Sequence, residues 1–143
     1  MNRILIFSSG SVCRSVMIES LLKTELESFT NLALYSSGMH YDMLDIQNTI
    51  LLLKENHHRT NGLNYKLHDE IYEQEFDLTF IVVNFLTEGT YEYLPNKEIY
   101  YIGYRGIDSD QNHMYHYVKQ TMLPAIKKII LREFTNQAVS ELL

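Results

Sequence analysis

The sequence is short of the residues that mark several specialised classes of protein. Its 143 residues include one cysteine, two prolines and six glycines, and its formal net charge is −6. A single cysteine excludes an internal disulfide, and the scarcity of proline and glycine argues against a linker or a disordered chain. The acidic balance argues against a general nucleic-acid binder, because such proteins hold phosphates on a basic surface.

Long apolar runs are also missing. The longest apolar stretches fall well short of the ~20 residues that a membrane-spanning helix needs, and the first residues lack the pattern of a signal peptide. We therefore expect a cytoplasmic protein with neither membrane nor nucleic-acid partners. Hydrophobic residues make up 45% of the chain, which is enough for a single domain over residues 1–143 with an ordinary core.

Short apolar runs alternate with segments of helical periodicity. The apolar runs predict strands over residues 3–7, 31–35, 76–83 and 99–102, and the periodic segments predict helices from Ser15, over 44–54 and over 113–134. A loop is expected over 56–62 and a short helix over 68–73. Strands that alternate with helices indicate a parallel sheet with helices on both faces, and ligands bind beyond the carboxyl ends of such strands.

Three local details of these elements can be predicted. The small residues Ser36-Ser37-Gly38 are expected to end the second strand in a turn. The helix over 44–54 is expected to bury the apolar face Leu44, Ile50, Leu51 and Leu53. Pro124 either kinks the last helix or divides it into two, because proline lacks the N–H that a helix interior uses.

The segment from Ser8 to Ser15 follows the first strand and leads into the first helix. Small residues let successive backbone N–H groups point into one concavity, and the helix start adds partial positive charge. Arg14 can offer a planar fork of donors to a tetrahedral anion. The alternative is a serine-rich turn with a surface arginine. We predict an anion site formed by Ser9, Gly10, Ser11, Val12, Cys13, Arg14 and Ser15.

The opening segment ILIFSSGSVCRSVMIESLL resembles that of the low-molecular-weight protein tyrosine phosphatases and the related thioredoxin-coupled arsenate reductases. Their loop has the form Cys-x5-Arg-Ser, and Ser8 stands at its first cysteine. The resemblance implies a three-layer α/β/α fold of the phosphotyrosine phosphatase I type, with a four-stranded parallel sheet in the order 2-1-3-4. It also implies phosphate or another oxyanion as ligand, a phosphotyrosine protein as partner, and no metal or cofactor.

Ser8 departs from this family at the decisive position. The family mechanism uses a thiolate that the loop stabilises, whereas a hydroxyl needs a neighbouring base. The resemblance therefore places Ser8, Arg14 and Asp108 at the catalytic positions and implies a phosphatase-like protein with little or no turnover. We favour a natural serine over an engineered Cys→Ser trap, because Ser9 and Ser11 also depart from the family loop.

Two other functions stay open from the sequence: an active tyrosine phosphatase captured as a trapping variant, and a phosphocarrier subunit of a sugar-transport system. Asp110 is the alternative to Asp108 for the general acid, and both can equally be solvated loop acids. Cys13 is interpreted as a buried thiol, and His57 and His58 as loop residues rather than metal ligands. Arsenate reduction is not favoured, because it needs further cysteines.

Overall fold

The computed structural model describes residues 2–11, 13–29, 31–40, 42–66, 71, 74–84, 99–106 and 109–134, and for residues 9–11 and 66 only the backbone. Its strands are β1 (Asn2–Ser11), β2 (Leu32–His40), β3 (Tyr65–Lys66), β4 (Leu78–Asn84) and β5 (Ile99–Tyr104). Its helices are α1 (Cys13–Glu25), α2 (Met43–Glu55), α4 (Gln111–Tyr117) and α5 (Leu123–Glu133), with the π-helical turn η1 (Val118–Met122) between the last two.

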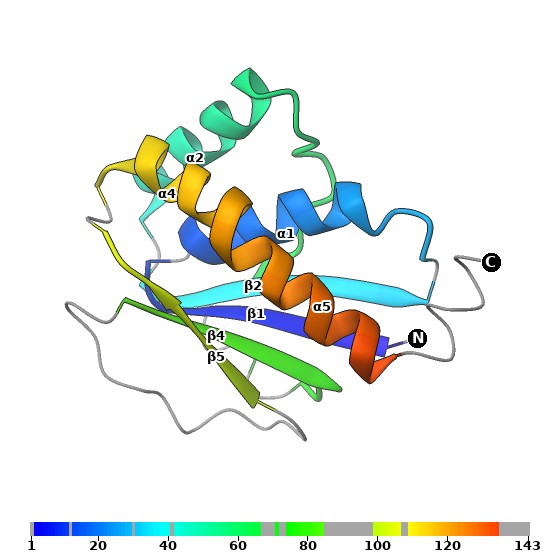
Figure 1. Cartoon of the computed structure of the whole chain (residues 1–143). Coiled ribbons are helices and arrows are strands. Elements are labelled where there is room, and N and C mark those ends of the chain that lie inside the picture. Colours follow the sequence, from blue (N-terminus) through cyan, green and yellow to red (C-terminus); the bar gives the residue numbers. More distant parts are fainter. Residues whose placement is uncertain are drawn as a thin grey trace.

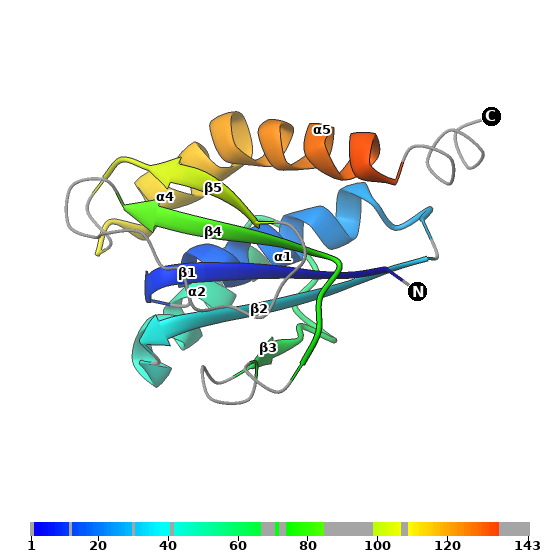
Figure 2. The ribbon, with the colours of Figure 1, turned by 90° about the horizontal axis from the view of Figure 1, so that it is seen from below.

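The strands form one parallel sheet in the order β3-β2-β1-β4-β5. The four longer strands therefore follow the predicted order 2-1-3-4, and the expected α/β class is confirmed. The two-residue edge strand β3 is an addition that the sequence analysis did not predict. Strands β1, β2, β4 and β5 all end at the same edge of the sheet (Figure 2).

Successive side chains of a strand point to opposite faces of the sheet, and apolar cores bury both faces at β1. Ile4 and Ile6 of β1 belong to a large core that also contains residues of all four described helices. These helices lie on one side of the sheet in Figure 1. Leu5 and Phe7 belong to a smaller core on the other face with Ile71. Ile71 is helical, as predicted for 68–73, but the other residues of that range lie outside the described part.

Helix α1 packs against β2 through small residues and a buried charge. Glu19 is fully buried and accepts hydrogen bonds from Ser36 Oγ at 2.5 Å and from the N–H of Asn64 at 2.6 Å. Lys23 forms an ion pair with the same carboxylate at 2.9 Å. The predicted turn at Ser36-Ser37-Gly38 is wrong, because these residues continue β2 and pair with β1. Their small size lets α1 approach the strand closely.

Helix α2 has the predicted location, but the face that it buries differs from the prediction. Ile46, Thr49 and Leu53 face the core, whereas Leu44 and Leu51 are exposed. Asp42 caps the helix, because its Oδ1 accepts hydrogen bonds from the N–H groups of Leu44 and Asp45 at 2.9 and 3.1 Å. The prediction is right for Leu53, which is buried, and for Ile50, which packs partly buried against the core, and it is wrong for Leu44 and Leu51.

The last helical region is continuous from Gln111 to Glu133. Pro124 lies in the first turn of α5, directly after η1. A π-helical turn changes the hydrogen-bond pattern of the backbone, so that the helix continues past a residue without an N–H. Pro124 therefore neither ends the helix nor divides it into two separate ones. No helix among the described residues has the length and apolarity required to cross a membrane.

Candidate anion-binding site

Ser8 lies at the carboxyl end of the central strand β1, where parallel α/β sheets bind their ligands. It pairs with Gly38 of β2 on one side and with Val82 of β4 on the other. Its side chain is fully buried. The residue that the sequence assigns to the nucleophile position therefore lies between two neighbouring strands at the expected edge of the sheet.

Strand β1 runs further than predicted, because it ends at Ser11 rather than at Phe7. Its register with β2 shifts after Ser8. The three steps from Ser8 to Ser11 match the two steps from Gly38 to His40 on the neighbouring strand. Such an extra residue is a β-bulge, which bends the strand and increases its twist. The predicted loop is therefore shorter, and its first part is a bulged extension of the strand.

The segment from Ser8 to Ser15 turns back on itself. The N–H of Ser15 donates a hydrogen bond to Ser8 Oγ at 2.9 Å, although seven fully extended residues would span roughly 23 Å. The Ser8 hydroxyl thus lies against the first turn of α1, where the helix carries partial positive charge. Val12 lies outside the described residues, as do the side chains of residues 9–11. Their predicted contacts with an anion stay predictions.

Arg14 is fully buried beside this segment. Its Nη1 donates to the carbonyl oxygen of Val82 at 3.1 Å, and its guanidinium carbon lies 5.9 Å from the centre of the Tyr104 ring. Val82 is also the register partner of Ser8, so Ser8 and the Arg14 guanidinium group share Val82 as a neighbour. The alternative of a surface arginine is therefore wrong.

The first turn of α1 also makes contacts with β2, α2 and α4. Ser15 Oγ donates to the carbonyl oxygen of Ser37 at 2.8 Å, which ties the helix start to β2. Cys13 is 2% exposed, and its Sγ accepts a weak hydrogen bond from Gln111 Nε2 at 3.9 Å. The same amide donates to the carbonyl oxygen of Asp45 at 3.1 Å. Gln111 therefore joins the starts of all three helices.

The predicted acid positions are described only in part. Asp108 lies outside the described residues, so its role as general acid stays a prediction. Asp110 is exposed and caps α4, because its Oδ1 accepts a hydrogen bond from the N–H of His113 at 3.1 Å. Asp110 thus has a structural role at the start of α4, and its place as the alternative general acid stays a prediction.

The chain leaves β5 through a tightly packed turn at Gly106. A Cβ atom at this position would lie 2.5 Å from Tyr104 Oη and 2.8 Å from His113 Cδ2, so only glycine fits without a shift of these rings. Asn84, the last residue of β4, donates through Nδ2 to the carbonyl oxygen of Gly106 at 2.9 Å. The tip of β4 and the ring of Tyr104 thus fix the start of the segment that carries Asp108.

Two residues near the site were not singled out by the sequence analysis. Tyr104 is fully buried next to Arg14. Its ring also packs edge-on against Tyr117 with 5.2 Å between the centroids. Asn84 is the last residue of a buried apolar strand, and a polar residue at that point of a parallel sheet is a signal that could have found it. Tyr91 and Tyr93 lie outside the described residues.

The paired histidines show no sign of a metal site. In the part of the chain that the structure describes, no group of three or more metal-ligating side chains comes together. His58 Nε2 instead shares a hydrogen bond with Tyr115 Oη at 2.6 Å. Burial and the nearby charges of Lys119 and His57 lower the pKa of His58. His57 is exposed in the loop that follows α2, as predicted.

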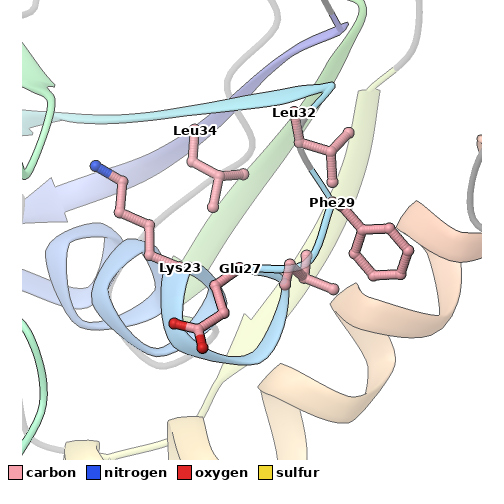
Figure 3. A pocket seen from close by; sticks show the side chains of 6 residues that line it. Lys23, Glu27, Phe29, Leu32 and Leu34 are labelled. Carbon is pink, nitrogen blue, oxygen red and sulfur yellow. The ribbon is translucent and has the colours of Figure 1, made fainter. Parts of the chain in front are cut away.

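A separate pocket lies near the amino end of β2, away from the carboxyl ends of the strands (Figure 3). Its lining is mainly apolar, and Lys23 is its one lysine. The ammonium group of Lys23 is engaged by the Glu19 carboxylate and the carbonyl oxygen of Gly62. The pocket therefore offers no cation to an oxyanion. It is lined by Lys23, Leu26, Glu27, Phe29, Leu32 and Leu34.

Comparison with known proteins gives a structural likeness and no sequence match. No protein-family model matches the chain, and no curated protein does so either. Among solved structures, the chain is similar to an arsenate reductase in the phosphate-binding state, with a TM-score of 0.68 and 14% identity over 92% of this chain and 98% of that one. An arsenate reductase in the reduced state gives a TM-score of 0.63 and 12% identity over the same shares.

The thioredoxin-dependent arsenate reductase of Corynebacterium glutamicum is a third similar structure. Its TM-score is 0.60 with 16% identity, over 92% of this chain and 63% of that one. Identities this low establish the fold and nothing more specific. The chain therefore has the α/β fold of these arsenate reductases, which is the fold that its opening segment led us to expect.

Proposed function

We propose that this chain binds phosphate or a related tetrahedral oxyanion through the segment from Ser8 to Arg14. The ligand is either free or carried by a phosphorylated protein, and the chain hydrolyses it little or not at all. The observation that carries this proposal is the 2.9 Å hydrogen bond from the N–H of Ser15 to Ser8 Oγ. It brings the serine hydroxyl to the start of α1, which is a favourable place for an anion.

The surroundings of Ser8 supply the charge that such an anion needs. The first amides of α1 contribute the partial positive charge of a helix N-terminus, and Arg14 contributes a full charge from a buried position. Both act in a site with little water, where electrostatic attraction is stronger than at the surface. A similar solved structure, an arsenate reductase, is described in a phosphate-binding state.

The same surroundings do not turn Ser8 into an efficient nucleophile. A hydroxyl needs a base that accepts its proton. Among the described residues, Ser8 Oγ contacts the Ser15 amide, and no histidine or carboxylate lies within hydrogen-bonding distance of it. Disulfide-forming arsenate reduction is also not proposed, because the chain has one cysteine. Asp108, or else Asp110, remains our candidate for the acid position.

A phosphate titration tests the proposal. We expect the amide NMR signals of Gly10 and Arg14 to shift and saturate as phosphate is added, with arsenate and sulfate as competitors. Arg14→Lys keeps the charge but loses the planar fork, so the affinity for phosphate should fall at least about tenfold. Arg105→Lys, an exposed arginine after β5, is the matched control. An unshifted spectrum, or equal losses in both variants, would contradict the proposal.

Hydrolysis of an aryl phosphate by the chain and by Ser8→Cys then separates the candidate functions. A binding protein whose site has diverged stays inactive in both forms. Strong turnover by Ser8→Cys alone would instead identify an active tyrosine phosphatase captured in a trapping form. Transfer of a phosphoryl group from a carrier protein to this chain would point to the phosphocarrier alternative.

A further inference from the structure

Helix α2 presents an apolar stripe away from the core. Leu44 is 65% exposed, Leu51 is 55% exposed and Met43 is 51% exposed. Leu44 and Leu51 lie seven residues apart, which is close to two helical turns, so they share one line along the helix. Ile46 and Leu53 lie on the opposite line and are buried. The two exposed leucines therefore point directly away from the molecule.

Leu51 lies between two shallow hollows of the surface. The exposed leucines resemble the knobs of a coiled coil, and the hollows resemble its holes. In such packing, a side chain of one helix fits into a space between side chains of the facing helix. One hollow lies along α2, and the other lies between α2 and the start of α4. They are lined by Gln47, Asn48, Ile50, Leu51 and Lys54, and by Asn48, Leu51, Leu52, Glu55, Gln111 and Asn112.

We propose that α2 packs antiparallel against α2 of a second copy of this chain. A two-fold axis between Gln47 and Asn48 places Leu44 of each copy against Leu51 of the other. Each leucine then lies roughly 5 Å along the helix from the axis. A closed two-fold dimer needs a surface that is complementary to itself, and the equal spacing of these leucines around one midpoint provides it.

The charges of the helix favour the same arrangement. In this register Lys54 lies within one residue of the level of the exposed cap residue Asp42 of the other copy. Glu55 is one residue further on and lies beyond the start of the facing helix. A parallel arrangement would instead bring Asp42 and Asp45 next to the same residues of the second copy. Lys54 therefore comes near Asp42 at both ends of the antiparallel pair, and Asp42 and Asp45 lie further from their counterparts than in a parallel pair.

The size of α2 limits the strength of the dimer. A helix of 13 residues is roughly 20 Å long, so that one pair of such helices buries less than the ~800 Å² per partner of a standard interface. We therefore expect a reversible dimer whose share rises with protein concentration. Analytical ultracentrifugation from roughly 10 µM to roughly 1 mM should show the mean mass rising from the 16.9 kDa of one chain towards twice that value.

Two variants test the role of the stripe. Leu44→Glu combined with Leu51→Glu should keep the mass at that of one chain over the whole range, while circular dichroism shows an intact fold. Tyr101→Glu is the matched control, because Tyr101 is also a large exposed side chain, at 43%, but lies on β5. A wild-type chain that stays monomeric, or a dimer that survives the double substitution, would overturn the proposal.

Cross-linking tests the register independently of the mass. Asn48 lies next to the proposed axis, so that two copies of Asn48→Cys should form a disulfide under mild oxidation. Two copies of Glu55→Cys would lie roughly 22 Å apart, far beyond the ~7 Å that a disulfide allows between Cα atoms. The buried Cys13 is present in both variants, so any cross-linking through Cys13 is the same in both. Absent cross-linking of Asn48→Cys, or equal cross-linking of both, would overturn the register.

Discussion

At Ser8, the same hydrogen bond would act differently on a hydroxyl and on a thiolate. The N–H of Ser15 donates to Ser8 Oγ at 2.9 Å, and such a bond to a neutral hydroxyl contributes only about 1 kcal/mol to stability. The same donor would favour a thiolate, because a hydrogen bond to the charged form lowers a pKa. A serine remains protonated in this setting. This contrast is why our proposal gives Ser8 a place in an anion site and no efficient turnover.

Gly106 makes a testable contribution to the same region. Gly106→Ala should destabilise the fold by about 1–3 kcal/mol, because the added Cβ would lie 2.5 Å from Tyr104 Oη and 2.8 Å from His113 Cδ2. Tyr104 is fully buried and has little room to move. Urea unfolding measures the loss, and Ser109→Ala, an exposed position in the same segment, is the control. Equal stability of the two variants would contradict this reading of Gly106.

At the scale of elements, the sequence predicted which segments form strands and helices better than where they end. Apolar runs identified the four longer strands, and their alternation with helices indicated a parallel sheet, whereas the order of the strands was implied by the family resemblance. The ends of β1 and β2 were misplaced, because serine and glycine are typical of turns. Here these small residues continue the strands beside α1. The strands continue there because of their contacts with one another and with α1, and such contacts cannot be predicted from the sequence of either strand alone.

The attachment of α1 to its neighbours depends on the buried carboxylate of Glu19. Glu19→Ala should cost at least about 2 kcal/mol, because Ser36 Oγ and the N–H of Asn64 would lose their acceptor inside the protein. Glu25→Ala on the same helix is the control. Its ion pair with Lys127 is partly exposed, so its loss should stay within about 1 kcal/mol. Similar unfolding midpoints for the two variants would contradict a structural role of Glu19.

At the scale of the whole molecule, the candidate site gathers parts from distant segments at one edge of the sheet. The opening segment with Ser8 and Arg14 could be predicted, because its small residues, arginine and following helix are contiguous. The contributions of Val82 and Tyr104 could not, because they depend on which strands become neighbours. The likeness to known enzymes placed Asp108 at the acid position, and its actual location stays a prediction.

A contact away from this site also joins distant segments of the chain. His58, in the loop after α2, shares a hydrogen bond with Tyr115 of α4 at 2.6 Å. Burial lowers the pKa of His58 below its usual 6.5, and Lys119 and His57 act in the same direction. The unfolded chain therefore binds a proton at His58 more readily than the folded chain does. This contribution to stability is fully present above pH 6.5 and is lost as the pH falls through the lowered pKa.

We therefore expect the urea midpoint of the chain to fall more steeply between about pH 7.5 and pH 5 than that of His58→Gln, which cannot take up this proton. The difference between the two curves isolates His58 from the carboxylates and other histidines that titrate in both proteins. His40→Gln removes an exposed histidine elsewhere and controls for the loss of one imidazole. If His58→Gln followed the wild-type curve in parallel at every pH, the burial of His58 and the nearby charges would not restrain its protonation.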